Sequence, residues 1–153
     1  MSDPKAFNLE EFNRNVMETL AGGESLFIWR HSGEGAIPHI RKIAEGEGYG
    51  VHTFVVSPMT LPYDLGRFAA SQGSSSKKSV LLLVEADHTD NPLRTQIAAA
   101  PVEHQLGGYK LPEQTRLICI GSDHIKALTR HDQADKLFAG NYTHLAFGTY
   151  KLD

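Results

Sequence analysis

The sequence predicts an α/β domain with three layers, in which helices cover both faces of a mostly parallel sheet. Two observations predict this class. Apolar, β-branched runs alternate along the chain with segments of helical period, which is typical of successive strand–helix–strand crossovers. Residues 79–85 contain an unbroken apolar run, as expected for a central strand buried on both faces. We expect a single domain over residues 1–153.

Each predicted element follows from local signals. Asn8, with Glu11 three residues later, is a helix cap, and the apolar residues after it have the helical period. Strands are predicted at residues 25–31, 51–56, 79–85, 116–121 and 144–147. Further helices are predicted at residues 38–45, 64–70 and 133–138, and another opens at Asn91-Pro92 and is closed by Pro101. Residues 102–111 are predicted to form a hairpin that turns at Gly107-Gly108.

Composition sets limits on function. The 153 residues carry a formal net charge of -3, so an anionic partner is neither predicted nor excluded. The single cysteine, Cys119, lies in an apolar run, and we interpret it as a core residue in a reducing compartment. No signal sequence, membrane-spanning run or metal-ligand spacing is visible. We therefore expect a cytoplasmic protein without a metal or cofactor.

A glycine-rich turn lies between the first predicted strand and the helix that follows it. Residues 32–37 read S-G-E-G-A-I, which resembles a loop whose backbone N–H groups surround a phosphate. A working P-loop reads G-x-x-x-x-G-K-[ST]. With Gly35 as its last glycine, the lysine position is Ala36, the Ser/Thr position is Ile37 and the first glycine position is Arg30. The pattern indicates an NTPase architecture without the residues for nucleotide chemistry.

Five further segments carry a family resemblance. Three are V-L-L-L-V-E-A-D-H at residues 80–88, H-Q-L-G-G-Y-K-L-P at 104–112 and R-L-I-C-I-G-S at 116–122. The other two are I-R-K-I-A-E at 40–45 and D-L-G-R at 64–67. Together they resemble the AAA+ ATPase core of the MoxR type over residues 25–145, and the hairpin is the most specific part. The resemblance implies a P-loop NTPase-like fold, namely an AAA+ core without the helical lid.

The resemblance also assigns the family's functional positions. The magnesium-binding aspartate falls on Val84, whereas the neighbouring glutamate that orients the attacking water is kept as Glu85. The sensor asparagine falls on Ser122 and the arginine finger on Asn141. Phosphoryl transfer depends on charge stabilisation by Lys, metal and Arg, and these positions have all changed. We therefore predict that the protein is not an enzyme and has no NTPase activity, and we interpret Glu85 as a structural carboxylate.

Seven residues form the predicted nucleic-acid contact. In the fold that the resemblance implies, the loop between the second and third strands and the hairpin before the fourth face the bound polymer. Basic loops donate to phosphates, and an exposed tyrosine stacks on an unpaired base. The predicted residues are Lys77, Lys78, Tyr109 and Lys110 on these two elements and Arg30, Arg41 and Lys42 around the glycine-rich turn. The alternative is that the lysines and Arg41 are solvated and that Tyr109 only caps the hairpin.

Two functions from different classes remain open. The first is a non-catalytic AAA+-like protein that binds single-stranded nucleic acid, with DNA favoured, forms a homo-oligomer and recruits an RNA polymerase or a replication factor. In size and composition the chain is similar to the single-stranded-DNA-binding transcription cofactors of lytic bacteriophages. The second is a protein–protein adaptor, or a decoy subunit for an active AAA+ partner, without nucleic acid. We favour the first because basic residues lie on the polymer-facing loops.

Overall fold

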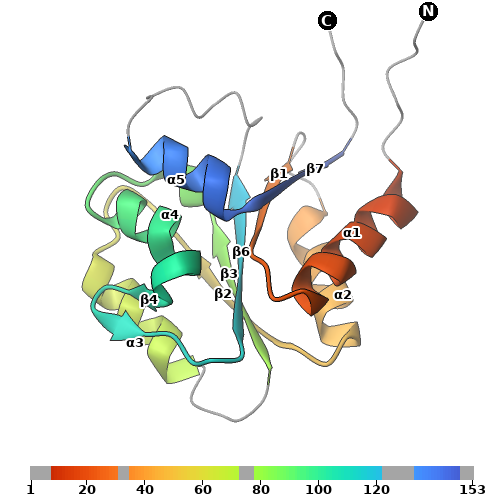
Figure 1. Cartoon of the computed structure of the whole chain (residues 1–153), viewed down its shortest axis with the longest axis horizontal. Helices are drawn as coiled ribbons and strands as arrows, with labels where there is room; N and C mark the ends of the chain where they lie inside the picture. Colours follow the sequence, from red (N-terminus) through yellow and green to blue (C-terminus); the bar gives the residue numbers. More distant parts are fainter. Residues whose placement is uncertain (1–7, 31–34, 73–77, 122–132, 149–153) are drawn as a thin grey trace, which may run out of the picture.

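The structure is a computed structural model that describes residues 8–30, 35–72, 78–121 and 133–148. The strands are β1 (Leu26–Arg30), β2 (Gly50–Val55), β3 (Ser79–Val84), β4 (Gln105–Leu106), β5 (Tyr109–Lys110), β6 (Thr115–Gly121) and β7 (Thr143–Phe147). The helices are α1 (Leu9–Ala21), α2 (Ala36–Gly46), α3 (Pro62–Gln72), α4 (Leu93–Glu103), α5 (Gln133–Asn141) and the short 3-10 helix η1 (Ala86–His88) (Figure 1). None of the described helices is both long and apolar enough to cross a membrane.

Five strands form one parallel sheet in the order β2-β3-β6-β1-β7. β3 pairs with β2 on one side and β6 on the other, and all six of its residues are buried, which confirms the predicted central strand. Since the strands are parallel, their carboxyl ends share one edge of the sheet and their amino ends the other. We call these the carboxyl edge and the amino edge. β4 and β5 form a separate antiparallel hairpin, also as predicted.

Helices cover both faces of the sheet and produce the three predicted layers (Figure 1). Successive strand residues point to opposite faces, so Phe27 and Ile28 belong to different buried clusters. α1 and α2 pack on the face of Ile28, and α3, α4 and α5 pack on the face of Phe27. Trp29 and Cys119 lie in the cluster that contains Phe27. Burial raises the pKa of the Cys119 thiol to about 12. Their predicted place in the core is confirmed.

The predicted cap of α1 is confirmed, because the Asn8 side-chain oxygen accepts a hydrogen bond from the Glu11 backbone N–H over 3.1 Å. On the other face of the sheet, a buried ion pair joins α4 to α5. It connects Arg94 and Asp135, and Arg94 also donates to the Asp87 carbonyl oxygen over 3.0 Å. A buried charge without a partner is strongly unfavourable, so this pair holds the two helices in one relative position.

The end of α4 differs from the prediction. Pro101 does not close the helix, which continues to Glu103, so the hairpin begins later than predicted. Proline lacks the N–H that would bond the carbonyl oxygen of Ile97, four residues earlier. The Tyr142 hydroxyl donates to that oxygen instead, over 2.7 Å. A residue distant in the sequence thus supplies the hydrogen-bond donor that Pro101 lacks.

Candidate nucleic-acid interface

The glycine-rich turn lies only partly within the described residues. Residues 31–34 fall outside them, and the described part begins at Gly35, whose φ of +76° suits glycine. Ala36, at the lysine position, is the first residue of α2, and its methyl group is fully buried against the sheet. A buried methyl group brings no charge to a phosphate.

Three of the other positions assigned by the resemblance lie within the described residues. Val84 ends β3 and is buried. Glu85 follows it with a φ of +63°, an unfavourable conformation for a residue with a side chain. Asn141 ends α5 and donates from its amide nitrogen to the Ala98 carbonyl oxygen over 3.0 Å. Ser122 lies outside the described residues.

The structure does not bring the predicted contact residues together. Lys77 lies outside the described residues, and only the backbone of Arg30 is described, at the carboxyl edge. Lys78 lies at the opposite, amino edge, immediately before β3. Its Nζ lies 4.6 Å from the centre of the Tyr49 ring and donates to the Glu47 carbonyl oxygen over 3.3 Å. Lys78 is therefore held on the face covered by α1 and α2.

Arg41 and Lys42 both lie on α2 and have exposed side chains. Arg41 pairs with Glu45, one turn later, at 3.8 Å. Lys42 borders a cavity of about 350 Å³ between α1 and α2, together with His39. Burial, and then the charge of Lys42, lower the pKa of His39. These two cations stand apart from the hairpin, which packs on the other face of the sheet.

The hairpin residues belong to a surface that includes α3. The rings of Tyr109 and Tyr63 meet edge to face, with their centres 5.7 Å apart. Tyr63 is 56% exposed, whereas Tyr109, which we expected to be exposed, is half-buried. Arg67 lies one turn after Tyr63, near enough to affect the ionisation of Tyr109, and Lys110 is exposed beside it. We call Tyr63, Arg67, Tyr109 and Lys110 the α3–hairpin surface.

Two glycines let α3 and the hairpin approach closely. A Cβ atom at Gly66 would overlap the carbonyl oxygen of Leu106, and one at Gly107 would overlap that of Pro62. Gly107 also has a φ of +56°, and its N–H donates to the Gln96 side-chain oxygen over 3.0 Å. The two tyrosines are therefore brought together by a close contact between the backbone of α3 and the backbone of the hairpin.

The electrostatics of this surface suit stacking. A hydrogen bond with Tyr63 is the main cause that raises the pKa of Tyr109, while Arg67 lowers it. The ring of Tyr109 is therefore uncharged at neutral pH. Arg67 and Lys110 supply positive charge, and the exposed Asp64 carboxylate on α3 partly offsets it. Such a surface can stack on a base and pair with a phosphate.

Sequence reasoning missed Tyr63 and Arg67. The signal was present, because residues four apart lie on one helical face, and both residues lie in or beside the D-L-G-R segment. That spacing alone did not show that this helical face meets the hairpin, since the two are joined only in the tertiary structure.

Solved structures with the same architecture are AAA+ proteins. Thermotoga maritima RuvB (A156S mutant) is similar with a TM-score of 0.63 at 14% identity, over 95% of this chain and 48% of RuvB. Drosophila ORC bound to AT-rich DNA and Cdc6 gives 0.60 at 12% identity, over 92% and 54%. NtrX from Brucella abortus gives 0.56 at 15% identity, over 93% and 36%.

The fold is that of the AAA+ P-loop ATPases. The predicted fold class, a P-loop NTPase-like α/β domain, is thereby confirmed. This chain spans about half the length of these proteins or less. No family model and no curated protein sequence matches it.

Proposed function

We propose that the chain is a non-catalytic AAA+-like protein that binds single-stranded nucleic acid, with DNA favoured, through the α3–hairpin surface. The observation that carries the proposal is the contact of the exposed Tyr63 ring with the half-buried Tyr109 ring, beside Arg67 and Lys110. Tyrosine rings stack on unpaired bases of any sequence, and basic side chains follow the phosphate backbone. A duplex keeps its bases stacked inside, so the pair favours a single strand.

The absence of catalysis is part of this proposal. The lysine, aspartate and arginine-finger positions are Ala36, Val84 and Asn141, and none of these side chains can stabilise the charge of a transferred phosphoryl group. An arginine finger alone contributes about 10³-fold or more to the rate. The rate losses at the three positions multiply. This supports a protein that binds nucleic acid but does not hydrolyse a nucleotide.

Recruitment of a polymerase or replication factor by a homo-oligomer completes the proposal. Met59 and Leu61 lie directly before Tyr63 and are 86% and 61% exposed. Neighbouring exposed apolar side chains mark a site for protein contact. Drosophila ORC is described as bound to AT-rich DNA, and RuvB as a Holliday junction branch migration motor. Both descriptions are compatible with a nucleic-acid partner here.

The test is fluorescence anisotropy with a labelled single-stranded oligonucleotide, a duplex of the same sequence, and a salt series. We expect Tyr63→Ala or Tyr109→Ala to weaken single-strand binding by about fivefold to a hundredfold, because each removes a stacking surface. Tyr109→Phe should retain most of the binding, since the ring remains. Lys110→Ala should weaken binding and lower the salt slope by about 0.7 if it contacts one phosphate.

The control is Lys136→Ala, which removes an exposed lysine from α5, away from this surface. The paired change Lys77→Ala with Lys78→Ala tests the residues predicted before β3. Equal losses in the Lys136 and Lys110 variants would indicate a general charge effect and contradict the proposed surface. No binding at low salt would contradict the nucleic-acid function altogether.

The second candidate is the adaptor or decoy subunit, and the exposed apolar residues before α3 also support it. Val55, at the end of β2, and Met59 and Leu61, between β2 and α3, are each more than half exposed. Under this function, Met59→Ser with Leu61→Ser abolishes co-purification with a co-expressed AAA+ partner, while Tyr109→Ala and Lys110→Ala have no effect. The two sets of variants therefore separate the two functions.

A further inference from the structure

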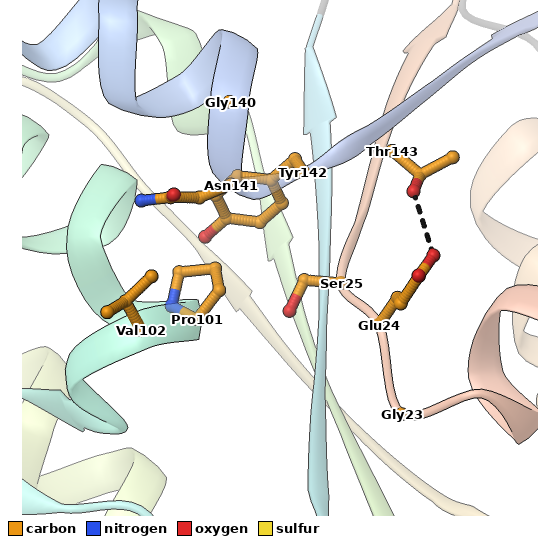
Figure 2. A pocket seen from close by; sticks show the side chains of 9 residues that line it. All are labelled: Gly23, Glu24, Ser25, Pro101, Val102, Gly140, Asn141, Tyr142 and Thr143. Carbon is orange, nitrogen blue, oxygen red and sulfur yellow. Dashed lines mark hydrogen bonds between the residues drawn. The ribbon is translucent and has the colours of Figure 1, made fainter.

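A pocket of about 350 Å³ lies at the amino edge of the sheet, away from the α3–hairpin surface (Figure 2). It forms where the chain enters β1, where α4 ends and where α5 passes into β7. Its walls come from three segments that are distant in sequence, so only the tertiary structure assembles it. Its chemistry is unusual because the polar groups that line it are mainly acceptors.

Glu24 and Asn141 supply two of these acceptors. One Glu24 carboxylate oxygen accepts a hydrogen bond from the Thr143 hydroxyl over 3.3 Å, as Figure 2 shows, and a carboxylate can accept several more. The Asn141 amide nitrogen is used toward Ala98, which leaves the amide oxygen as the acceptor end of that side chain. The hydroxyl of Ser25 lies between them.

Two helix ends add negative potential. α4 and α5 both place their last turns at the pocket, and the final carbonyl groups of a helix have no partner within it. These carbonyls carry a partial negative charge. Among the described residues, no lysine, arginine or histidine lines the pocket. The Arg116 guanidinium lies near Gly23, and its Nε donates to the Leu20 carbonyl oxygen over 3.3 Å.

The remaining wall is apolar. It consists of the Pro101 ring, the Val102 side chain and the Tyr142 ring. The Tyr142 hydroxyl donates its proton to the Ile97 carbonyl oxygen, so it has no proton left to donate to a ligand. A ligand that fits both walls has a positively charged donor head and an apolar stem.

We propose that this pocket binds an alkyl guanidinium, the group at the end of an arginine side chain. The planar guanidinium has five donors in a fixed fork, which suits a carboxylate beside amide and carbonyl oxygens better than an ammonium does. Its alkyl stem would lie along Pro101 and Val102. The source is either an arginine of a protein, including a second copy of this chain, or a free small molecule.

The test uses N-acetyl-arginine-amide, whose only charge is the guanidinium, and follows backbone amide signals of the full chain by NMR. We expect saturable shifts of the signals of Gly23, Ser25 and Gly140, with a Kd in the millimolar range that is normal for so small a ligand. N-acetyl-citrulline-amide, which has the same shape but no charge, should produce no saturable shift. Equal shifts with the citrulline compound, or none with the arginine compound, would overturn the proposal.

Glu24→Gln keeps the shape of the side chain and removes its charge. We expect it to weaken binding by about threefold to tenfold, since Glu24 is exposed and its bond to the ligand is partly screened. The matched control, Glu45→Gln on α2, should leave the Kd unchanged. Equal effects of the two variants would reduce the binding to general charge attraction and overturn the assigned pocket.

Two further measurements distinguish an arginine of a protein from a free small molecule as the natural ligand. An arginine in the middle of an otherwise uncharged peptide should bind at least as tightly as the free compound if the natural ligand is protein-borne, and more weakly if the pocket accepts only a small molecule. Self-association that is lost in Glu24→Gln, measured by sedimentation, would identify a second copy as the source. Neither measurement involves Tyr63 or Tyr109, so the outcome is independent of single-strand binding.

Discussion

Tyr142 shows how one side chain can replace a backbone donor. Its hydroxyl is buried and bonds the Ile97 carbonyl oxygen that Pro101 leaves without an N–H. Burial is also the main cause that raises the pKa of this hydroxyl well above its ordinary value, so it stays protonated and donates throughout the neutral range. The last turn of α4 therefore depends on a residue that begins the connection to β7.

We predict that Tyr142→Phe lowers the free energy of unfolding by about 1–3 kcal/mol, because it leaves the Ile97 carbonyl buried without a donor. Urea unfolding measures the change. Tyr49→Phe is the matched control, since its hydroxyl makes only a longer bond of 3.4 Å to Leu20 and its loss should cost less. Adding Pro101→Ala to Tyr142→Phe should restore part of the loss by returning an N–H to the helix. An equal loss in both tyrosine variants would contradict this account.

His144 is held as a neutral imidazole. Its Nδ1 accepts from the Trp29 indole N–H over 2.9 Å, so Nε2 carries the proton and donates to the Phe138 carbonyl oxygen over 2.8 Å. Protonation of Nδ1 would break the bond to Trp29. Burial is the main cause that lowers the pKa of His144 below 6.5, although the bond to Phe138 opposes it.

The sign of the pH effect follows from this lowered pKa. As the pH falls below about 6.5, the unfolded chain binds a proton before the folded chain does, so stability decreases. We expect the urea midpoint to be constant between about pH 8 and pH 7 and to fall toward pH 5. His144→Gln should reduce this dependence. His39→Gln is needed in parallel, because burial also lowers the pKa of His39. An unchanged profile in the His144 variant would refute the assignment.

At the scale of elements, the junction of α3 with the hairpin determines whether the proposed binding surface exists. Gly66 and Gly107 allow backbone to touch backbone, and Tyr63 and Tyr109 meet only because of this contact. The local sequences explain why a helix and a hairpin form. They do not explain why two rings from these elements lie together.

We predict that Gly66→Ala separates α3 from the hairpin and lowers the free energy of unfolding by about 1–3 kcal/mol, because the new methyl group overlaps the Leu106 carbonyl. Single-strand affinity should fall with it, as measured by anisotropy at a temperature where the variant is folded. Gly46→Ala is the matched control, since a Cβ there meets nothing within 4 Å and alanine favours the helix. A Gly66→Ala variant with unchanged stability would show that the junction can relax.

At the scale of the whole molecule, the P-loop NTPase-like architecture is present without the residues that the resemblance assigns to hydrolysis. The sheet order and the three layers depend on buried apolar clusters, and Ala36 and Val84, at two of the assigned catalytic positions, are members of one of them. Burial of apolar surface stabilises the architecture whether or not a nucleotide binds. At these two positions, apolar side chains that contribute to the core stand where the resemblance places a lysine and an aspartate.

We predict no phosphate release from ATP with Mg²⁺ above a protein-free control, even at high protein concentration. The physical reason is the loss of the lysine, metal and arginine contributions at Ala36, Val84 and Asn141. Glu85→Gln serves as the control for contamination. Metal-dependent hydrolysis that disappears in Glu85→Gln would contradict the prediction, whereas hydrolysis that persists unchanged in this variant would come from another enzyme.

The sequence by itself determined the fold class, the central strand and the cap of α1. These depend on periodicity and on bonds between near neighbours, such as Asn8 with Glu11, so they are encoded locally. Family motifs added the assignment of Ala36, Val84 and Asn141. Local signals gave the wrong end for α4, because the compensating hydroxyl of Tyr142 lies far along the chain.

Only the tertiary structure decided which of these residues can act together. It separated Lys78 from the hairpin, joined Tyr63 and Arg67 to Tyr109, and assembled the pocket around Glu24. The physical reason is that such groupings result from packing between elements, through close contacts of glycines and bonds to distant carbonyls. The periodicity of one segment shows which of its own side chains share a face. It does not show which side chains of another segment will contact that face.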